Sequence, residues 1–241
     1  MRSLVLTLTS LLFASLCLTP GKAQSSGNTL DINPIYQETT EWCWVATGQM
    51  IFQYFQIPMI NRIDGQCGIV SLWGAHAVPP PGQLSGPCLA DCRACPFPAG
   101  QVDTIAAMLQ QYPIMAGFFY HRRIAPLRFQ TSQSALTQQQ ISDEIDASRP
   151  VLVGISPSGN SAFGPQHVAL IVGYETDAND NLFLIVNDPF PFAYFAAQGI
   201  SDPYIVAGGQ NMDDGRYRIS YRDFKNRMHW SVSIHHLRQG S

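Results

Sequence analysis

The sequence predicts an α+β domain, with helices in the first half of the chain and an antiparallel sheet in the second. Apolar residues recur at three- and four-residue steps over residues 42–56, as on one face of a helix. Residues 151–156, 167–174 and 181–187 are instead short apolar runs typical of strands. With 241 residues, 46% of them apolar, the chain suits one core of about 200 residues, and we expect a single domain over residues 37–241.

The first 23 residues have the features of a secretory signal peptide. Arg2 supplies a positive charge, and residues 4–18 form an apolar run too short to span a membrane comfortably. Gly21 and Ala23 place small residues before the expected cleavage site. We therefore expect residues 1–23 to be removed and the protein to be secreted or periplasmic.

Cleavage also sets the charge of the mature chain. Loss of Arg2 and Lys22 leaves 12 basic and 17 acidic residues, a net charge of −5. This charge disfavours nucleic acid and anionic membranes as partners. No second apolar run reaches spanning length, so we expect no membrane span, and we expect a monomer.

The first half of the chain carries two expected helices separated by loops. Residues 24–36 are polar and predict a short tail, after which Thr40 caps a helix from about Trp42 to Gln56. Residues 57–100 are rich in proline, glycine and cysteine and predict loops. The second helix is expected over residues 102–112, ended by Pro113 and followed by a strand over 114–120.

The second half begins with a capping box. Thr137 and Gln140 have the spacing that begins a helix, here expected to continue to about Ser148. Three strands follow, of which the last two form a hairpin, and a further strand is expected near the C-terminus. These strands are Val151–Ser156, His167–Tyr174, Asn181–Asn187 and Trp230–His236.

Five cysteines remain after signal removal, and an odd number in an exported protein indicates one free thiol. Cys43 is the candidate for this free thiol, because its neighbours in the sequence are those expected around a reactive cysteine. The other four, Cys67, Cys88, Cys92 and Cys95, then form two disulfides, most easily between the first two and the last two. Zinc bound by these thiolates is the alternative, and we expect no metal.

Cys43 is expected in the first turn of a helix. The partial positive charge and unpaired amides of a helix N-terminus stabilise a thiolate, which is a strong nucleophile. Gln37, six residues earlier, carries an amide that can donate to a developing oxyanion.

His167 opens a predicted strand and is the candidate base for this thiol. An imidazole also needs an acceptor on its second nitrogen. Asn187 and Asp188 close the neighbouring strand, where either could bond the ring. The sequence leaves both open.

These residues together resemble the papain-like cysteine peptidases. The order is Gln-x5-Cys-Trp before a helix, then His and Asn or Asp on adjacent strands. Glu41-Trp42-Cys43-Trp44, His167–Gly173 and Asp188-Pro189 are similar to the branch that contains the effector AvrRpt2 and the C39-like enzymes. The resemblance implies a papain-like fold with a nucleophile, Cys43, an acid–base, His167, an orienting Asp188 and an oxyanion donor, Gln37.

The implied activity is peptide hydrolysis through an acyl-enzyme, with a peptide or protein substrate and no cofactor. The chain departs from papain at Thr40, where papain has a cysteine, and it has no large pro-domain. A transglutaminase-like acyl transferase or deamidase is the first alternative. A non-catalytic secreted binding or effector module on the same scaffold is the second.

Overall fold

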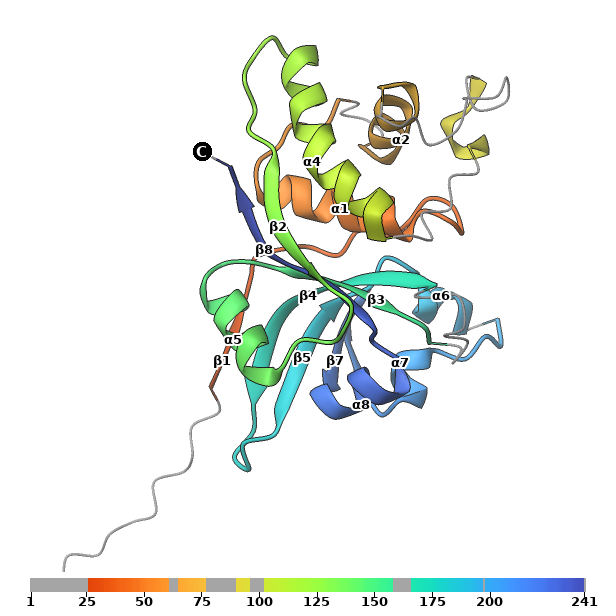
Figure 1. Cartoon of the computed structure of the whole chain (residues 1–241). Helices are drawn as coiled ribbons and strands as arrows, with labels where there is room; N and C mark the ends of the chain where they lie inside the picture. Colours follow the sequence, from red (N-terminus) through yellow and green to blue (C-terminus); the bar gives the residue numbers. More distant parts are fainter. Residues whose placement is uncertain are drawn as a thin grey trace, which may run out of the picture.

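The computed structural model describes residues 26–60, 65–76, 90–95, 102–157, 166–196 and 198–240. The signal peptide expected over residues 1–23 lies outside this part of the chain and stays a prediction. Figure 1 shows three helices gathered on one side of a twisted antiparallel sheet: α1 (Cys43–Tyr54), α2 (Gly65–His76) and α4 (Val102–Phe119). This mixed arrangement confirms the expected α+β class.

The described part of the sheet has eight strands, and every pairing in it is antiparallel. Their order is β2–β8–β3–β4–β5–β7–β6, and β1 pairs with β4. The bounds are β1 Ser26–Thr29, β2 Leu127–Ser132, β3 Val151–Ile155, β4 His167–Thr176, β5 Leu182–Asn187, β6 Gln210–Asp213, β7 Arg216–Ser220 and β8 Val232–Gln239. The expected β4–β5 hairpin is confirmed.

The shorter helices around the sheet are α5 Gln138–Asp146, α6 Phe192–Ala196, α7 Pro203–Val206 and α8 Tyr221–Arg227, whereas η1 Cys92–Ala94 lies beside α2. The capping box of α5 is confirmed, since Thr137 Oγ1 accepts from Gln140 N and Gln140 Oε1 accepts from Thr137 N. Within the described residues no helix has the length and apolar character needed to cross a membrane.

Close packing between α1 and α4 fixes the helix that carries Cys43. Phe52 on α1 stacks on Tyr112 of α4 with ring centroids 4.5 Å apart, and both are fully buried. A Cβ at Gly48 would lie 2.5 Å from Met108 Cε, so the absence of a side chain lets α4 approach. Because interiors are close-packed, these contacts leave α1 little freedom to move.

The prediction that Pro113 ends a helix and that a strand follows is wrong. Helix α4 runs through Pro113 to Phe119. Its buried residues Met108, Tyr112 and Ala116 keep a helical spacing on both sides of the proline. A proline removes one backbone hydrogen bond from a helix, and here the burial of a continuous apolar face outweighs that loss.

Two other segments are more ordered than expected. Helix α2 lies within the stretch predicted as loops, where Ile69 and Val70 are fully buried and offset the poor helix propensity of its glycines. Residues 26–29 of the expected tail form β1 on the sheet, and Ile32 behind them is buried. The start of the chain after the expected cleavage site therefore contributes to the fold.

Candidate active site

Cys43 is the first residue of α1, as expected, but Thr40 does not cap that helix. Trp42 is the N-cap residue, and its side chain makes no capping hydrogen bond. The start of a helix favours a nearby negative charge. Cys43 is a free, half-buried thiol. Trp42 and Trp44 beside it are both buried.

His167 and Asp188 meet across the β4–β5 hairpin. His167 begins β4, and Asp188 directly follows β5. The His167 Nε2–Asp188 Oδ1 distance is 2.8 Å, and the Asp188 side chain is fully buried. With Nε2 bonded to Asp188, Nδ1 is the ring nitrogen left to interact with Cys43, which lies near enough to raise the pKa of His167. The three side chains thus stand in the order Cys43, His167, Asp188.

The electrostatics of this pair favour an imidazolium. Burial acts to lower the pKa of His167, but the charge and hydrogen bond of Asp188, together with Cys43, raise it to about 10. The rings of Phe190 and Phe192 stand edge-on to the imidazole with centroids 6.5 and 6.1 Å away. Such apolar walls limit water access and strengthen the ion pair.

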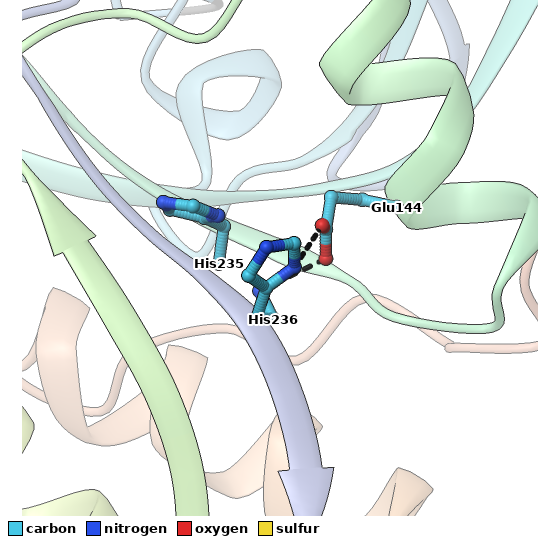
Figure 2. Close-up of side chains that lie close together, drawn as sticks. All are labelled: Glu144, His235 and His236. Carbon is cyan, nitrogen blue, oxygen red and sulfur yellow. Dashed lines mark hydrogen bonds and ion pairs between the residues drawn. The ribbon is translucent and has the colours of Figure 1, made fainter.

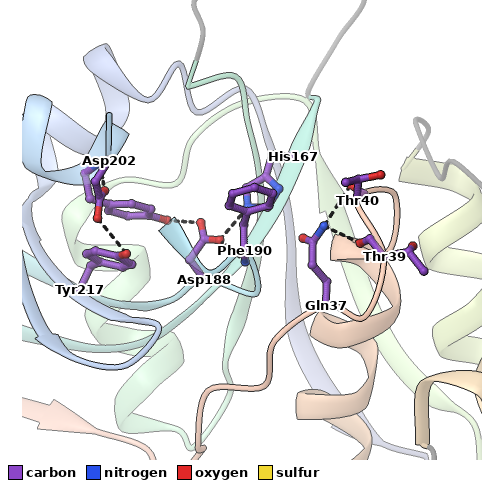
Figure 3. A network of polar contacts seen from close by, with 9 residues as sticks. Gln37, Thr39, Thr40, His167, Asp188, Phe190, Asp202 and Tyr217 are labelled. Atoms are coloured by element: carbon purple, nitrogen blue, oxygen red, sulfur yellow. Dashed lines mark hydrogen bonds and ion pairs between the residues drawn. The ribbon is translucent and has the colours of Figure 1, made fainter. Parts of the chain in front are cut away.

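Asp188 is held by more donors than His167 alone (Figure 3). Its Oδ1 also accepts from Phe190 N at 2.8 Å, and its Oδ2 accepts from Tyr204 Oη at 2.7 Å. Tyr204 is fully buried and stacks on Tyr217, which in turn donates to Asp202. This aromatic support was missed from the sequence, because Tyr204 lies 16 residues beyond Asp188 with no motif linking them.

Asn187, the other candidate for orienting His167, has its side chain engaged elsewhere. Its Nδ2 donates to Ile32 O at 2.7 Å, and its Oδ1 accepts from Arg216 Nε at 3.0 Å. Successive residues of a strand point to opposite faces, so Asn187 and Asp188 cannot both face the histidine. The structure brings Asp188 to the ring, and Asn187 ties β5 to the N-terminal segment.

Gln37 lies near this site, but its side-chain amide is bonded to backbone carbonyls of its own segment. Its Nε2 donates to Thr39 O at 2.7 Å and to Thr40 O at 3.0 Å, as Figure 3 shows. Its Oε1 is buried and has no hydrogen-bond partner. In this orientation both amide hydrogens are occupied, so the side chain must turn before it can donate to an oxyanion.

The backbone around Gln37 is fixed from two sides. Gln37 N donates to Pro189 O at 2.8 Å, next to Asp188. On the other side, the buried Gln66 of α2 accepts from Glu38 N at 3.0 Å and donates to Tyr36 O at 2.6 Å. Gln66 was not identified from the sequence. It holds the segment that approaches Cys43 in register with the strand end that carries Asp188.

The cysteines follow the expected pattern where they are described. Cys67 and Cys92 form a disulfide that links α2 to η1, and Cys95 is disulfide-bonded as well. Cys88 lies outside the described residues, so the second pairing stays a prediction. The thiol of Cys43 is left free.

Helices beside an antiparallel sheet, with a cysteine at a helix start facing a His–Asp pair, are the arrangement of a papain-like cysteine peptidase. The model of the Peptidase_C39 like family matches residues 103–225, and the chain belongs to this family. The match includes His167 and Asp188, whereas Gln37 and Cys43 precede it. It does not separate the AvrRpt2 branch from other members. No curated protein sequence matches the chain.

Proposed function

We propose that this protein is a secreted cysteine peptidase that hydrolyses peptide bonds through Cys43, His167 and Asp188. The observation that carries the proposal is the 2.8 Å contact of His167 Nε2 with the buried Asp188, with Cys43 near enough to raise the pKa of the same ring. A thiol, a base and a buried orienting carboxylate in this order are the parts that acyl transfer requires. The signal peptide predicted over residues 1–23 is the ground for proposing export.

In the first step, the Cys43 thiolate attacks the peptide carbonyl carbon, and the carbonyl oxygen becomes an oxyanion. The Cys43 backbone N–H at the start of α1 donates to that oxyanion, and Gln37 joins it once its amide turns from Thr39 and Thr40. The C–N bond then breaks as His167 transfers its proton to the leaving amine. The products of this step are an amine and a thioester on Cys43.

In the second step, His167 takes a proton from water, and the hydroxide attacks the thioester carbonyl. Collapse of this intermediate releases a carboxylic acid and restores the Cys43–His167 pair. Asp188 keeps the ring oriented and stabilises its charge throughout. These steps use only groups of the chain and water.

The proposal is tested by mass spectrometry after treatment with a thiol-directed peptidyl epoxide. We expect a single adduct on Cys43, and we expect its loss in both Cys43→Ala and His167→Ala. Asp180→Asn, an exposed change in the β4–β5 turn, is the control and should be labelled like the parent. An unmodified Cys43 in folded protein overturns the assignment. Transfer of amines to a glutamine substrate without peptide cleavage supports the acyl transferase alternative instead.

A further inference from the structure

A groove of about 790 Å³ lies between α4 and the part of the sheet formed by β2 and β8. Arg128, Arg149, Arg238 and His236 line it, and none of its described lining residues is acidic. This is notable in a chain whose formal net charge is −3. The groove is therefore a local concentration of positive charge on an otherwise acidic protein.

The groove is distinct from the candidate active site, because the two lie at opposite ends of the same strands. Ile155, at the end of β3, is the register partner of His167, whereas Arg149 precedes the start of that strand. Along β8, Val232 pairs near the His167 end, and Arg238 follows six residues later, about 20 Å away at strand spacing.

A buried glutamate, Glu144, holds two of the lining residues, Arg149 and His236, and Figure 2 shows its contact with His236. Glu144 is 2% exposed and accepts from Arg149 Nε at 2.8 Å and from Arg149 Nη2 at 3.2 Å. The same carboxylate accepts from the backbone N of His236 and contacts its ring. Burial acts to raise the pKa of Glu144, but Arg149 and His236 hold it below its ordinary value, so the carboxylate stays charged.

The backbone at His236 is strained in a way that directs its side chain. His236 has a φ of 55°, and the β2–β8 register shifts beside it as in a β-bulge. A bulge re-aims side chains, and a non-glycine residue in the left-handed region costs about 1 kcal/mol or more. The bulge places the ring of His236 against Glu144 and beside His235, with the two imidazole centroids 4.7 Å apart.

Glu144, His235 and His236 lie close enough to suggest a metal site, since one ligand atom of each falls within 4.8 Å of the others. However, both oxygens of Glu144 already accept bonds from Arg149 and His236. A guanidinium at this position repels a cation and attracts an anion. The cluster therefore does not favour a metal ion. The Glu144 carboxylate balances the charge of Arg149, so this part of the groove adds polar contacts rather than net positive charge.

Arg128 and Arg238 line another part of the groove. They are direct partners across the β2–β8 pair, and both are exposed. Neither makes an ion pair with any residue that the structure describes. Like charges opposite each other destabilise a strand pair, so a negatively charged ligand bound between them would remove a repulsion as well as add attraction.

The size and lining of the groove favour a peptide over a small anion. Residues of β2, of β8 and of the segment before β3 line it together, so it lies across these neighbouring strands and beside α4. A volume of about 790 Å³ suits a ligand of several residues rather than a single anion. Gln110 and Gln130 offer amide groups, and the 42%-exposed Ile114 offers an apolar contact.

We propose that this groove binds an acidic polypeptide segment whose carboxylates contact Arg128 and Arg238. Such a segment matches the charge and the volume of the groove. The site is independent of the chemistry at Cys43, so it would act as a second contact for an acidic protein substrate or partner.

The experiment uses the full mature chain with Cys43→Ala, which prevents cleavage of the probe. The probe is a fluorescent peptide of alternating glutamate and valine. The uncharged control is the same peptide with glutamine in place of each glutamate. We expect anisotropy to show binding of the glutamate peptide that weakens with added salt. Adding both Arg128→Gln and Arg238→Gln should weaken the affinity for the glutamate peptide at least about tenfold.

Arg222→Gln is the matched control, because Arg222 is 82% exposed on α8 and lies outside the groove. Binding by this variant should be unchanged, and a cooperative thermal unfolding transition in every variant shows that each is folded. Equal binding of the two peptides, or equal binding by the double variant, overturns the proposal. Binding of inorganic pyrophosphate or of phosphatidylglycerol vesicles without binding of the peptide also overturns it and indicates a different anionic ligand.

Discussion

Replacing Asp188 by asparagine removes a charge while keeping the shape of the side chain, so it tests how His167 acquires its proton. Asp188 accounts for most of what raises the pKa of His167 to about 10, and burial acts in the opposite direction. Without the carboxylate we expect that pKa at or below its ordinary value of 6.5. At pH 8 the imidazolium fraction then falls from nearly all to about 3%. This loss of the protonated form alone lowers kcat/KM at least about 30-fold.

The assay is the pH profile of kcat/KM on a fluorogenic peptide between pH 5 and about 10.5. In the parent we expect the alkaline limb near pH 10, and in Asp188→Asn we expect it below pH 7. Asp180→Asn should leave the limb in place. An alkaline limb that stays where it is in Asp188→Asn refutes the reasoning, even if the overall rate falls.

The free energy of unfolding should also depend on the His167–Asp188 ion pair. Folding raises the pKa of His167 above its unfolded value, so this contribution is fully present below about pH 6.5 and is lost as the pH rises through about 10. Breaking a buried ion pair costs about 3–5 kcal/mol. Urea unfolding should therefore show Asp188→Asn as less stable than the parent by about this amount at pH 6, with a smaller gap at pH 10. A gap that widens at alkaline pH contradicts the pairing.

Three further changes, one of them with a matched control, have definite expected results. Tyr204→Phe removes the donor to Asp188 Oδ2 and should lower stability by about 1.5–3 kcal/mol and also lower kcat/KM. The matched Tyr217→Phe should lower stability alone, and equal activity losses in both contradict a positioning role. Gln37→Ala should lower kcat by about 10²–10³, measured with saturating peptide, and an unchanged kcat excludes the oxyanion role. Thr137→Ala should reduce the free energy of unfolding by about 1 kcal/mol in urea titrations, without changing activity.

The sequence predicts this fold best where the local pattern and the tertiary packing favour the same structure. The capping box at Thr137 and the apolar runs of β3, β4 and β5 are such places. Pro113 is the opposite case, because its local preference is to end a helix, whereas a buried helical face continues across it. Helix α2 is similar, since it depends on burial and on the Cys67–Cys92 disulfide rather than on its own propensity.

The candidate site also contains residues that a local pattern predicts and residues that only the fold brings together. Cys43, His167 and Asp188 could be chosen because each stands at the beginning or end of a predictable element. Tyr204 and Gln66 could not, since their importance comes from distant partners, Asp188 in one case and Tyr36 in the other. Single-sequence patterns report local spacing, whereas a buried hydrogen bond between distant residues appears only once the fold is known.

The position of Gln37 limits what must move in the proposed reaction. Its backbone is bonded to Pro189 on one side, and its neighbours are bonded to the buried Gln66 on the other, so the segment itself cannot shift without breaking both. The amide, in contrast, is held only by the carbonyls of Thr39 and Thr40, and its own oxygen is buried without a partner. An unsatisfied buried oxygen makes this orientation costly. A rotation of the side chain that exchanges one carbonyl acceptor for the oxyanion therefore requires little rearrangement of the chain around it.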